Sequence, residues 1–151
     1  MKNARLESVQ IRVRDMQFTA RLEWALSPAT CRSFAARLPV RAKLIQARWS
    51  GEAAWIPLAQ LEFAVSQEAA TGSPNAGDIL FHPADHSECE ILIPYGKAVF
   101  RCKDGDLLGN HFLTIIEGKE QLGKLGELVL WHGSQDIEFI AAGHSPCSKS
   151  E

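Results

Sequence analysis

Strict alternation of apolar and polar residues near the start of the chain constrains the fold more than any other feature of this sequence. Val9, Ile11 and Val13 alternate with polar residues, and the alternation resumes over residues 18–26 after a turn at residues 14–16. A period of two buries one face of a strand and leaves the other face in water. The two runs therefore predict a β-hairpin with one buried face.

Short strand-like runs continue toward the end of the chain and are separated by turns rich in glycine and proline. They cover residues 43–49, 53–57, 61–65, 78–82, 90–93, 98–102, 112–116, 129–132 and 137–141. This pattern predicts a mainly β protein, and a small closed barrel removes the exposed edges that an open sheet would keep. A parallel α/β fold is disfavoured because helices do not separate the strands.

One α-helix is predicted over residues 28–38. Ser27 is a suitable N-cap, and Pro28 suits the first helical position because its missing N–H has no partner there. Pro39 disfavours helical geometry at the preceding residue and ends the helix. Residues three and four positions apart form an apolar stripe that would cover one end of a barrel. The stripe consists of Cys31, Phe34, Ala35 and Leu38.

A second, short helix is predicted over residues 119–128, although Gly123 and Gly126 lower its helix propensity. The sequence contains no internal repeat, no low-complexity run and no linker between domains. We therefore expect a single domain over residues 1–142, followed by a flexible tail over residues 143–151.

Composition excludes several classes of function. The chain has 151 residues, 46% of them hydrophobic, so it can bury a core without disulfides or a metal. A net charge of −2 argues against a nucleic-acid partner, and no run of about 18 apolar residues predicts a membrane span. The N-terminus lacks a signal-peptide pattern and the four cysteines form no C-x-x-C pair, so we expect a cytoplasmic protein with reduced thiols.

Several segments carry a resemblance to a known family. Residues 19–39 resemble the opening of a cyclophilin, with a strand followed by a helix that begins at Pro28 and Thr30 and contains Phe34. The resemblance covers residues 8–141 and implies a small closed β-barrel with helical caps, but no defined activity. The segments that resemble a bacterial cyclophilin-like family of unknown function are, in order, residues 47–58, 76–83, 90–96 and 109–118.

The leading hypothesis for function is that a polar pocket of the barrel binds a small molecule or a short peptide. A first alternative is peptidyl-prolyl isomerisation, because Arg48 lies where the cyclophilin arginine is expected and an arginine near the prolyl nitrogen lowers the rotation barrier of about 18–20 kcal/mol. The glutamine-containing run that follows this arginine in cyclophilins has no counterpart here. A second alternative is a non-enzymatic interaction or assembly module, and the sequence leaves a homo-oligomer open.

We expect the pocket residues to converge from distant parts of the chain at one cavity mouth. Arg48 would clamp a carboxylate or carbonyl, with Glu52 orienting it. Arg48 and His111 are the candidate catalytic residues, since an imidazole titrates near neutrality. The predicted ligand-binding set is Arg48, Trp49, Glu52, Trp55, Tyr95 and His111. The structural alternatives are a salt bridge at a hairpin for Arg48 and Glu52, core packing for the tryptophans, a hairpin corner for Tyr95 and a hydrogen-bonded structural histidine for His111.

No metal and no cofactor is predicted. Residues 82–89 contain histidine, aspartate, glutamate and cysteine, but they fall in a loop without a recognised metal-binding spacing. The sequence also lacks the glycine-rich loops of nucleotide-binding proteins and the motif around a catalytic serine.

Overall fold

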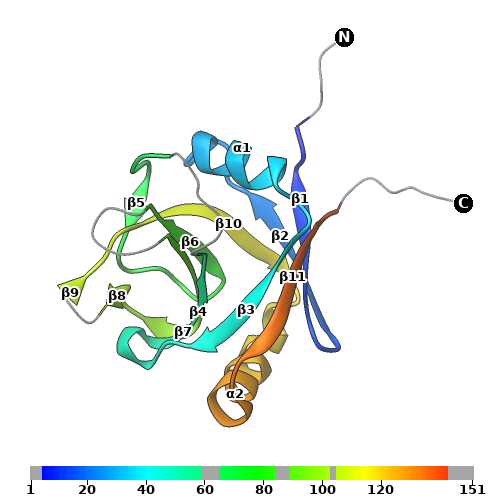
Figure 1. The fold of residues 1–151 in the computed structure, drawn as a ribbon, viewed down its shortest axis with the longest axis vertical. Coiled ribbons are helices and arrows are strands. Elements are labelled where there is room, and N and C mark those ends of the chain that lie inside the picture. Colours follow the sequence, from blue (N-terminus) through cyan, green and yellow to red (C-terminus); the bar gives the residue numbers. More distant parts are fainter. Residues whose placement is uncertain (1–4, 59–64, 84–88, 103–104, 143–151) are drawn as a thin grey trace, which may run out of the picture.

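Eight antiparallel strands close into a barrel, as the alternating pattern predicts (Figure 1). A computed structural model of the chain describes residues 5–58, 65–83, 89–102 and 105–142. The strands run around the barrel in the order β2, β1, β11, β3, β4, β7, β6 and β10, and β10 pairs with β2 to complete the closure. Their bounds are β1 Ser8–Val13, β2 Met16–Leu22, β3 Val40–Gln46, β4 Gly51–Pro57, β6 Asp78–His82, β7 Glu90–Ala98, β10 Gly109–Glu117 and β11 Gln135–Ala141.

Three two-residue strands lie beside this barrel. β5 (Ala70–Thr71) extends the sheet beyond β10, while β8 (Arg101–Cys102) pairs with β9 (Gly105–Asp106).

The N-terminal hairpin is confirmed. Val13 pairs with Met16, so only Arg14 and Asp15 form the turn. Arg14 has a φ of 54°, in the left-handed region that two-residue hairpin turns use. Every second residue of both strands is buried, because one face of the hairpin lines the barrel interior.

Helix α1 (Pro28–Ala36) covers one end of the barrel (Figure 1). Its Phe34 is fully buried between Phe112 of β10 and Phe139 of β11. The ring centroids of Phe34 and Phe112 are 5.1 Å apart, and those of Phe34 and Phe139 are 5.2 Å apart, both edge to face. These rings and the inward-facing aliphatic side chains of the strands fill the interior.

The cap of α1 differs from the one predicted. Ser27 makes no side-chain cap bond, because its hydroxyl donates to the backbone carbonyl of His111 at 2.9 Å. The carboxylate of Glu68 instead accepts hydrogen bonds from the backbone N–H of Ala29 at 3.0 Å and of Thr30 at 2.9 Å. A residue 38 positions away in the chain therefore satisfies the first turn of the helix.

Helix α2 (Leu122–His132) lies at the opposite end of the barrel and follows the 3₁₀ turn η2 (Lys119–Gln121) (Figure 1). The helix predicted over residues 119–128 is confirmed, but the strand predicted over residues 129–132 is wrong, since the helix continues through it. Burial at helical spacing outweighs the strand propensity of that short apolar run. The buried residues of the helix are Leu122, Leu125, Gly126 and Val129.

The strand predicted over residues 43–49 is displaced by three residues, because β3 spans Val40–Gln46. β3 ends at Gln46, and the 3₁₀ turn η1 (Arg48–Ser50) follows. Gly51 has a φ of 95°, which side chains rarely adopt, and this conformation turns the chain into β4. Because Arg48 and Trp49 lie in this turn and not in a strand, period-two alternation does not decide which way their side chains point.

Two expectations concern parts of the chain for which the structure gives no account. The strand predicted over residues 61–65, apart from Val65, and the tail predicted over residues 143–151 lie outside the described residues. Within the described residues, no helix has the length and apolar character needed to cross a bilayer.

Candidate functional site

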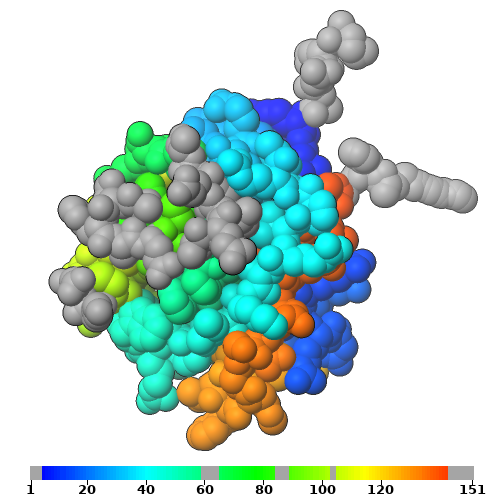
Figure 2. Space-filling view, viewed as in Figure 1, coloured from blue at the N-terminus to red at the C-terminus, as the bar shows by residue number. Residues whose placement is uncertain are grey.

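A cleft of about 470 Å³ lies on the outside of the barrel, between α2 and the ends of β3, β4 and β7. We call it the α2 cleft. In Figure 2 the orange surface of α2 meets the cyan surface of the β3–β4 segment at the lower edge of the molecule. The cleft is outside the barrel because apolar side chains fill the interior where we expected the pocket. Its lining residues are Gln46, Arg48, Gly51, Glu52, Tyr95, Gly123, Gly126, Glu127 and Leu130.

A bulge in β7 shapes one wall of the cleft. Ala53 pairs with Pro94, but Gly51, two residues earlier on β4, pairs with Ala98, four residues later on β7. The two extra residues bend β7 and re-aim its side chains, as bulges beside binding sites commonly do. Tyr95 lies within this bulge and lines the cleft.

Glu52 stabilises the bulge. Its Oε1 accepts a hydrogen bond from the backbone N–H of Lys97 at 2.8 Å, a group that the disrupted ladder leaves free. Gly96 makes this approach possible, because a Cβ at that position would overlap the Glu52 carboxylate. One oxygen of Glu52 therefore has a structural partner.

Tyr95 is held from two sides. Its hydroxyl donates to Oε1 of Gln46 at 2.7 Å. Its ring packs on α2 at Gly126, where a Cβ would overlap the ring carbons. Burial raises the pKa of Tyr95 above its ordinary value, the negative charges of Glu52 and Glu127 add to the rise, and the positive charge of Arg48 opposes it. Tyr95 is therefore a neutral, rigid wall of the cleft.

The charged side chains that line the cleft do not form ion pairs with one another. Arg48 is exposed, and its guanidinium has no hydrogen bond or ion pair with any described residue. Glu127 on α2 is likewise without such a partner in the described parts of the chain. Arg48 and Glu52 do not form the salt bridge that was the structural alternative for them. One cation and two carboxylates thus border a cavity large enough for a small ligand.

Three of the predicted site residues meet in this cleft, namely Arg48, Glu52 and Tyr95. Trp49 and Trp55 do not line it. They contact each other edge to face with centroids 5.7 Å apart, and Trp49 lines a neighbouring hollow beside η1. Tyr95, and neither of the two predicted tryptophans, is the aromatic residue that lines the cleft.

His111, another of the predicted site residues, does not line the α2 cleft. Its Nε2 lies 2.8 Å from Oγ1 of Thr114 and 3.8 Å from Oδ1 of Asp78. The Thr114 hydroxyl in turn donates to Glu23 at 2.5 Å. These contacts fit the structural alternative, a hydrogen-bonded histidine on the barrel wall.

Sequence reasoning missed the contribution of α2 to the site. Glu127 and Leu130 line the cleft from this helix, and Gln46 lines it from the end of β3. A signal was present at Gly126 in the second predicted helix, because a glycine inside a helix costs stability and can mark a close approach. Gly126 makes such an approach to Tyr95.

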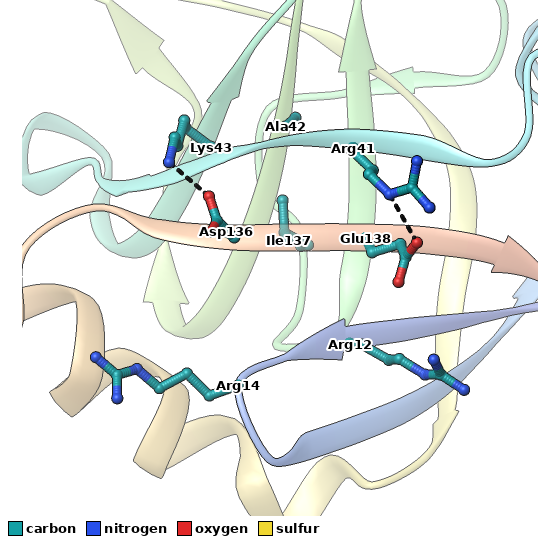
Figure 3. A pocket seen from close by; sticks show the side chains of 8 residues that line it. All are labelled: Arg12, Arg14, Arg41, Ala42, Lys43, Asp136, Ile137 and Glu138. Carbon is teal, nitrogen blue, oxygen red and sulfur yellow. Dashed lines mark hydrogen bonds and ion pairs between the residues drawn. The ribbon is translucent and has the colours of Figure 1, made fainter.

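A second, larger hollow of about 660 Å³ lies over the outer face of β1, β11 and β3 (Figure 3). Two sets of charged residues face one another across the strands on this surface. In one, Arg41 donates to Glu138 at 2.9 Å, and Arg12 stands opposite the same glutamate in register. In the other, Lys43 pairs with Asp136. We call this surface the charge ladder. Cross-strand pairs of this kind stabilise a sheet, so the positions of Glu138 and Asp136 are explained without a ligand. Arg14 donates to Gln135, and Arg12 has no ion pair with a described residue.

The described residues include no group of three or more histidine, cysteine, aspartate or glutamate side chains placed to hold a metal ion. His82 and Cys89, at the two ends of the predicted loop, are buried, and residues 84–88 between them lie outside the description.

Comparisons with known proteins support the fold. No curated protein matches the chain. A solved structure of McbB in complex with tryptophan is similar with a TM-score of 0.64 and 13% identity over 93% of this chain, which spans only 46% of McbB. The solution structure of the hypothetical protein AF2241 from Archaeoglobus fulgidus is similar with a TM-score of 0.59 and 18% identity, covering 94% of this chain and 100% of that one.

The family comparison identifies the chain more directly. A family model described as "Protein of unknown function (DUF3830)" matches residues 9–141, which include the whole barrel from β1 to β11 apart from Ser8. The chain therefore belongs to the DUF3830 family.

Proposed function

We propose that this protein binds a small zwitterionic molecule, one that carries both an ammonium group and a carboxylate, in the α2 cleft. An amino acid or a short peptide is the simplest ligand of this class. The observation that supports the proposal is the presence of unpaired charges of both signs around one cavity.

Each end of such a ligand has a matching group. The guanidinium of Arg48 presents planar donors that suit a carboxylate. Glu127 and the second oxygen of Glu52 suit an ammonium group, since ionised carboxylates only accept hydrogen bonds. Tyr95 and Leu130 add apolar contact between the two ends. Binding rather than catalysis is proposed, because His111, the predicted acid or base, lies elsewhere.

Two points from outside the cleft are compatible with the proposal. Tryptophan, the ligand in the McbB structure, is itself a zwitterion and belongs in a ligand panel, although the likeness to McbB supports the fold alone.

The cyclophilin-like relationship also stays a proposal, and no described feature favours prolyl isomerisation over plain binding. A protease-coupled assay with a proline peptide tests that alternative.

Isothermal titration calorimetry of the full chain with leucine, tryptophan and leucyl-alanine tests the proposal. We expect wild-type protein to bind at least one of them and Arg48→Ala to weaken that binding about tenfold or more, because a charged hydrogen-bond partner is removed. Arg41→Ala, which removes an arginine of the charge ladder, is the matched control and should bind as wild type does. Equal binding by Arg48→Ala and wild type contradicts the proposal.

A further inference from the structure

A second hollow lies beside the α2 cleft, at η1. This hollow, of about 370 Å³, is bordered by Arg48 and Gly51, which also border the cleft. We call it the η1 hollow. Its remaining lining residues are Trp49, Ser50, Lys97, Ala98, Val99 and Arg101. The two hollows thus share an edge, and a ligand longer than one residue can extend from one into the other.

The two hollows differ in charge. The α2 cleft has two carboxylates and the shared Arg48, whereas the described residues that line the η1 hollow include Arg48, Lys97 and Arg101 and no carboxylate. Arg101 is partly neutralised by Asp106, with 3.1 Å between Nε and Oδ1. The side chain of Lys97 has no hydrogen bond or ion pair with a described residue. Free positive charge therefore increases from the cleft to the hollow.

The β7 bulge builds both hollows at once. Tyr95 and Lys97 are separated by Gly96 within the bulge, and they line the cleft and the hollow respectively. The far wall of the hollow is also fixed, because the Ser50 hydroxyl accepts a hydrogen bond from the backbone N–H of Arg101 at 3.0 Å and donates to its carbonyl at 3.2 Å. The half-exposed Trp49 gives this wall an apolar surface.

We propose that the ligand is a short acidic peptide, with the ammonium group of its N-terminal residue facing the carboxylates of the α2 cleft, a backbone carbonyl facing Arg48, and an acidic side chain of its second or third residue in the η1 hollow, facing Lys97. This inference rests on the proposed function, since the N-terminal residue occupies the site proposed there. It adds a second subsite that selects for negative charge at the second or third residue of the peptide.

The experiment compares leucyl-alanyl-glutamate with leucyl-alanyl-glutamine, which differ in one charge, by calorimetry at low ionic strength with the full chain. Wild-type protein should bind the glutamate peptide about fivefold more tightly, the upper range for an exposed ion pair. Lys97→Ala should remove that preference and leave the affinity for the glutamine peptide unchanged. Lys43→Ala, on the charge ladder, is the matched control and should keep the preference.

The outcomes separate the two proposals. Equal affinity of wild type for both peptides, or a preference that persists in Lys97→Ala, overturns the acidic subsite. If leucine still binds in a manner sensitive to Arg48→Ala, the proposed function stands without it. No binding of leucine or of either peptide overturns both. Because Lys97 is exposed, its replacement should leave the unfolding midpoint unchanged, which circular dichroism checks.

Discussion

The α2 cleft and the charge ladder are both lined by arginine and acidic side chains, but they differ in whether the acidic side chains form ion pairs. On the ladder, Glu138 and Asp136 each form an ion pair with a cation on the neighbouring strand (Figure 3). In the cleft, Arg48 and Glu127 form no ion pair with any residue in the described ranges. The ladder is the larger hollow, so size alone does not identify the functional site.

The difference follows from the backbone beneath each surface. The ladder lies on three regular strands, where facing residues meet in register and opposite charges can pair. The cleft lies where regular pairing ends, at η1 and the β7 bulge, so Arg48 and Glu52 have no cross-strand partner in register. In the cleft, irregular backbone leaves charges of both signs unpaired, whereas on the regular strands both carboxylates are paired and only a cation, Arg12, is without an ion pair to a described residue.

The largest expected effect concerns the shape of the cleft. Gly126→Ala should destabilise the protein by about 2 kcal/mol, because the new Cβ would overlap the Tyr95 ring. Gly123→Ala, one turn away on the same helix, meets nothing within 4 Å and should stabilise by about 0.5–1 kcal/mol through helix propensity. Urea unfolding measures both, and a shift in the same direction for the two variants would show that the helix does not pack on Tyr95 as described.

A smaller loss of stability is expected when Glu68 is replaced. Its carboxylate accepts hydrogen bonds from the backbone of α1 and belongs neither to the charge ladder nor to the α2 cleft. Burial alone would raise its pKa, but hydrogen bonds from the Thr30 hydroxyl and from the N–H groups of Ala29 and Thr30 hold it below the ordinary value. Glu68→Gln should therefore cost about 1.5 kcal/mol at neutral pH.

The pH dependence tests that explanation. Since the folded pKa of Glu68 is lowered, its contribution is present above the ordinary value of 4.5 and is lost as the pH falls through the folded value. The difference in unfolding free energy between wild type and Glu68→Gln should shrink below pH 4.5. A constant difference from pH 7 to pH 3 would contradict the role of the ionised carboxylate.

Tyr95 tests the rigidity of the cleft wall. Tyr95→Phe removes the hydrogen bond to Gln46 and should cost about 1 kcal/mol. Since the pKa of Tyr95 is raised, the unfolded chain loses this proton first, and wild type should lose stability above the ordinary value of 10.0. The variant lacks that loss, so the two unfolding free energies should converge in strongly alkaline solution. Parallel curves up to pH 11 would count against a buried phenol.

The smallest effect is expected on the charge ladder. Lys43→Ala and Asp136→Ala should each change the unfolding free energy by less than about 0.5 kcal/mol, because both side chains are mostly exposed and water screens their attraction. A double-mutant cycle measures their coupling. A coupling above about 1 kcal/mol would show that the ladder is more than a surface pair and would weaken the contrast with the cleft.

Much of the fold could be predicted from the sequence because its signals are local. The hairpin of β1 and β2, the closed mainly β architecture and the position of α1 all follow from the period of the hydrophobic pattern and from turn residues. The errors occur where distant residues decide the local outcome. Glu68 replaces Ser27 as the cap of α1, and burial against the barrel turns a strand-like run into the end of α2.

The candidate site was predicted only in part for the same reason. Arg48 and Glu52 are close in sequence, so their proximity was foreseeable, whereas Tyr95 reaches the cleft from within the bulged strand β7 and not from a hairpin corner. Glu127 comes from a helix whose extent the sequence did not reveal, and His111 occupies a different part of the barrel wall.

The sequence by itself determined that this chain forms a small β-barrel with helices at its ends, because alternation and helical spacing are properties of neighbouring residues. Only the tertiary structure decided which charges are paired and which face a cavity. That depends on strand register and on a bulge, and both are set by contacts between residues far apart in the chain.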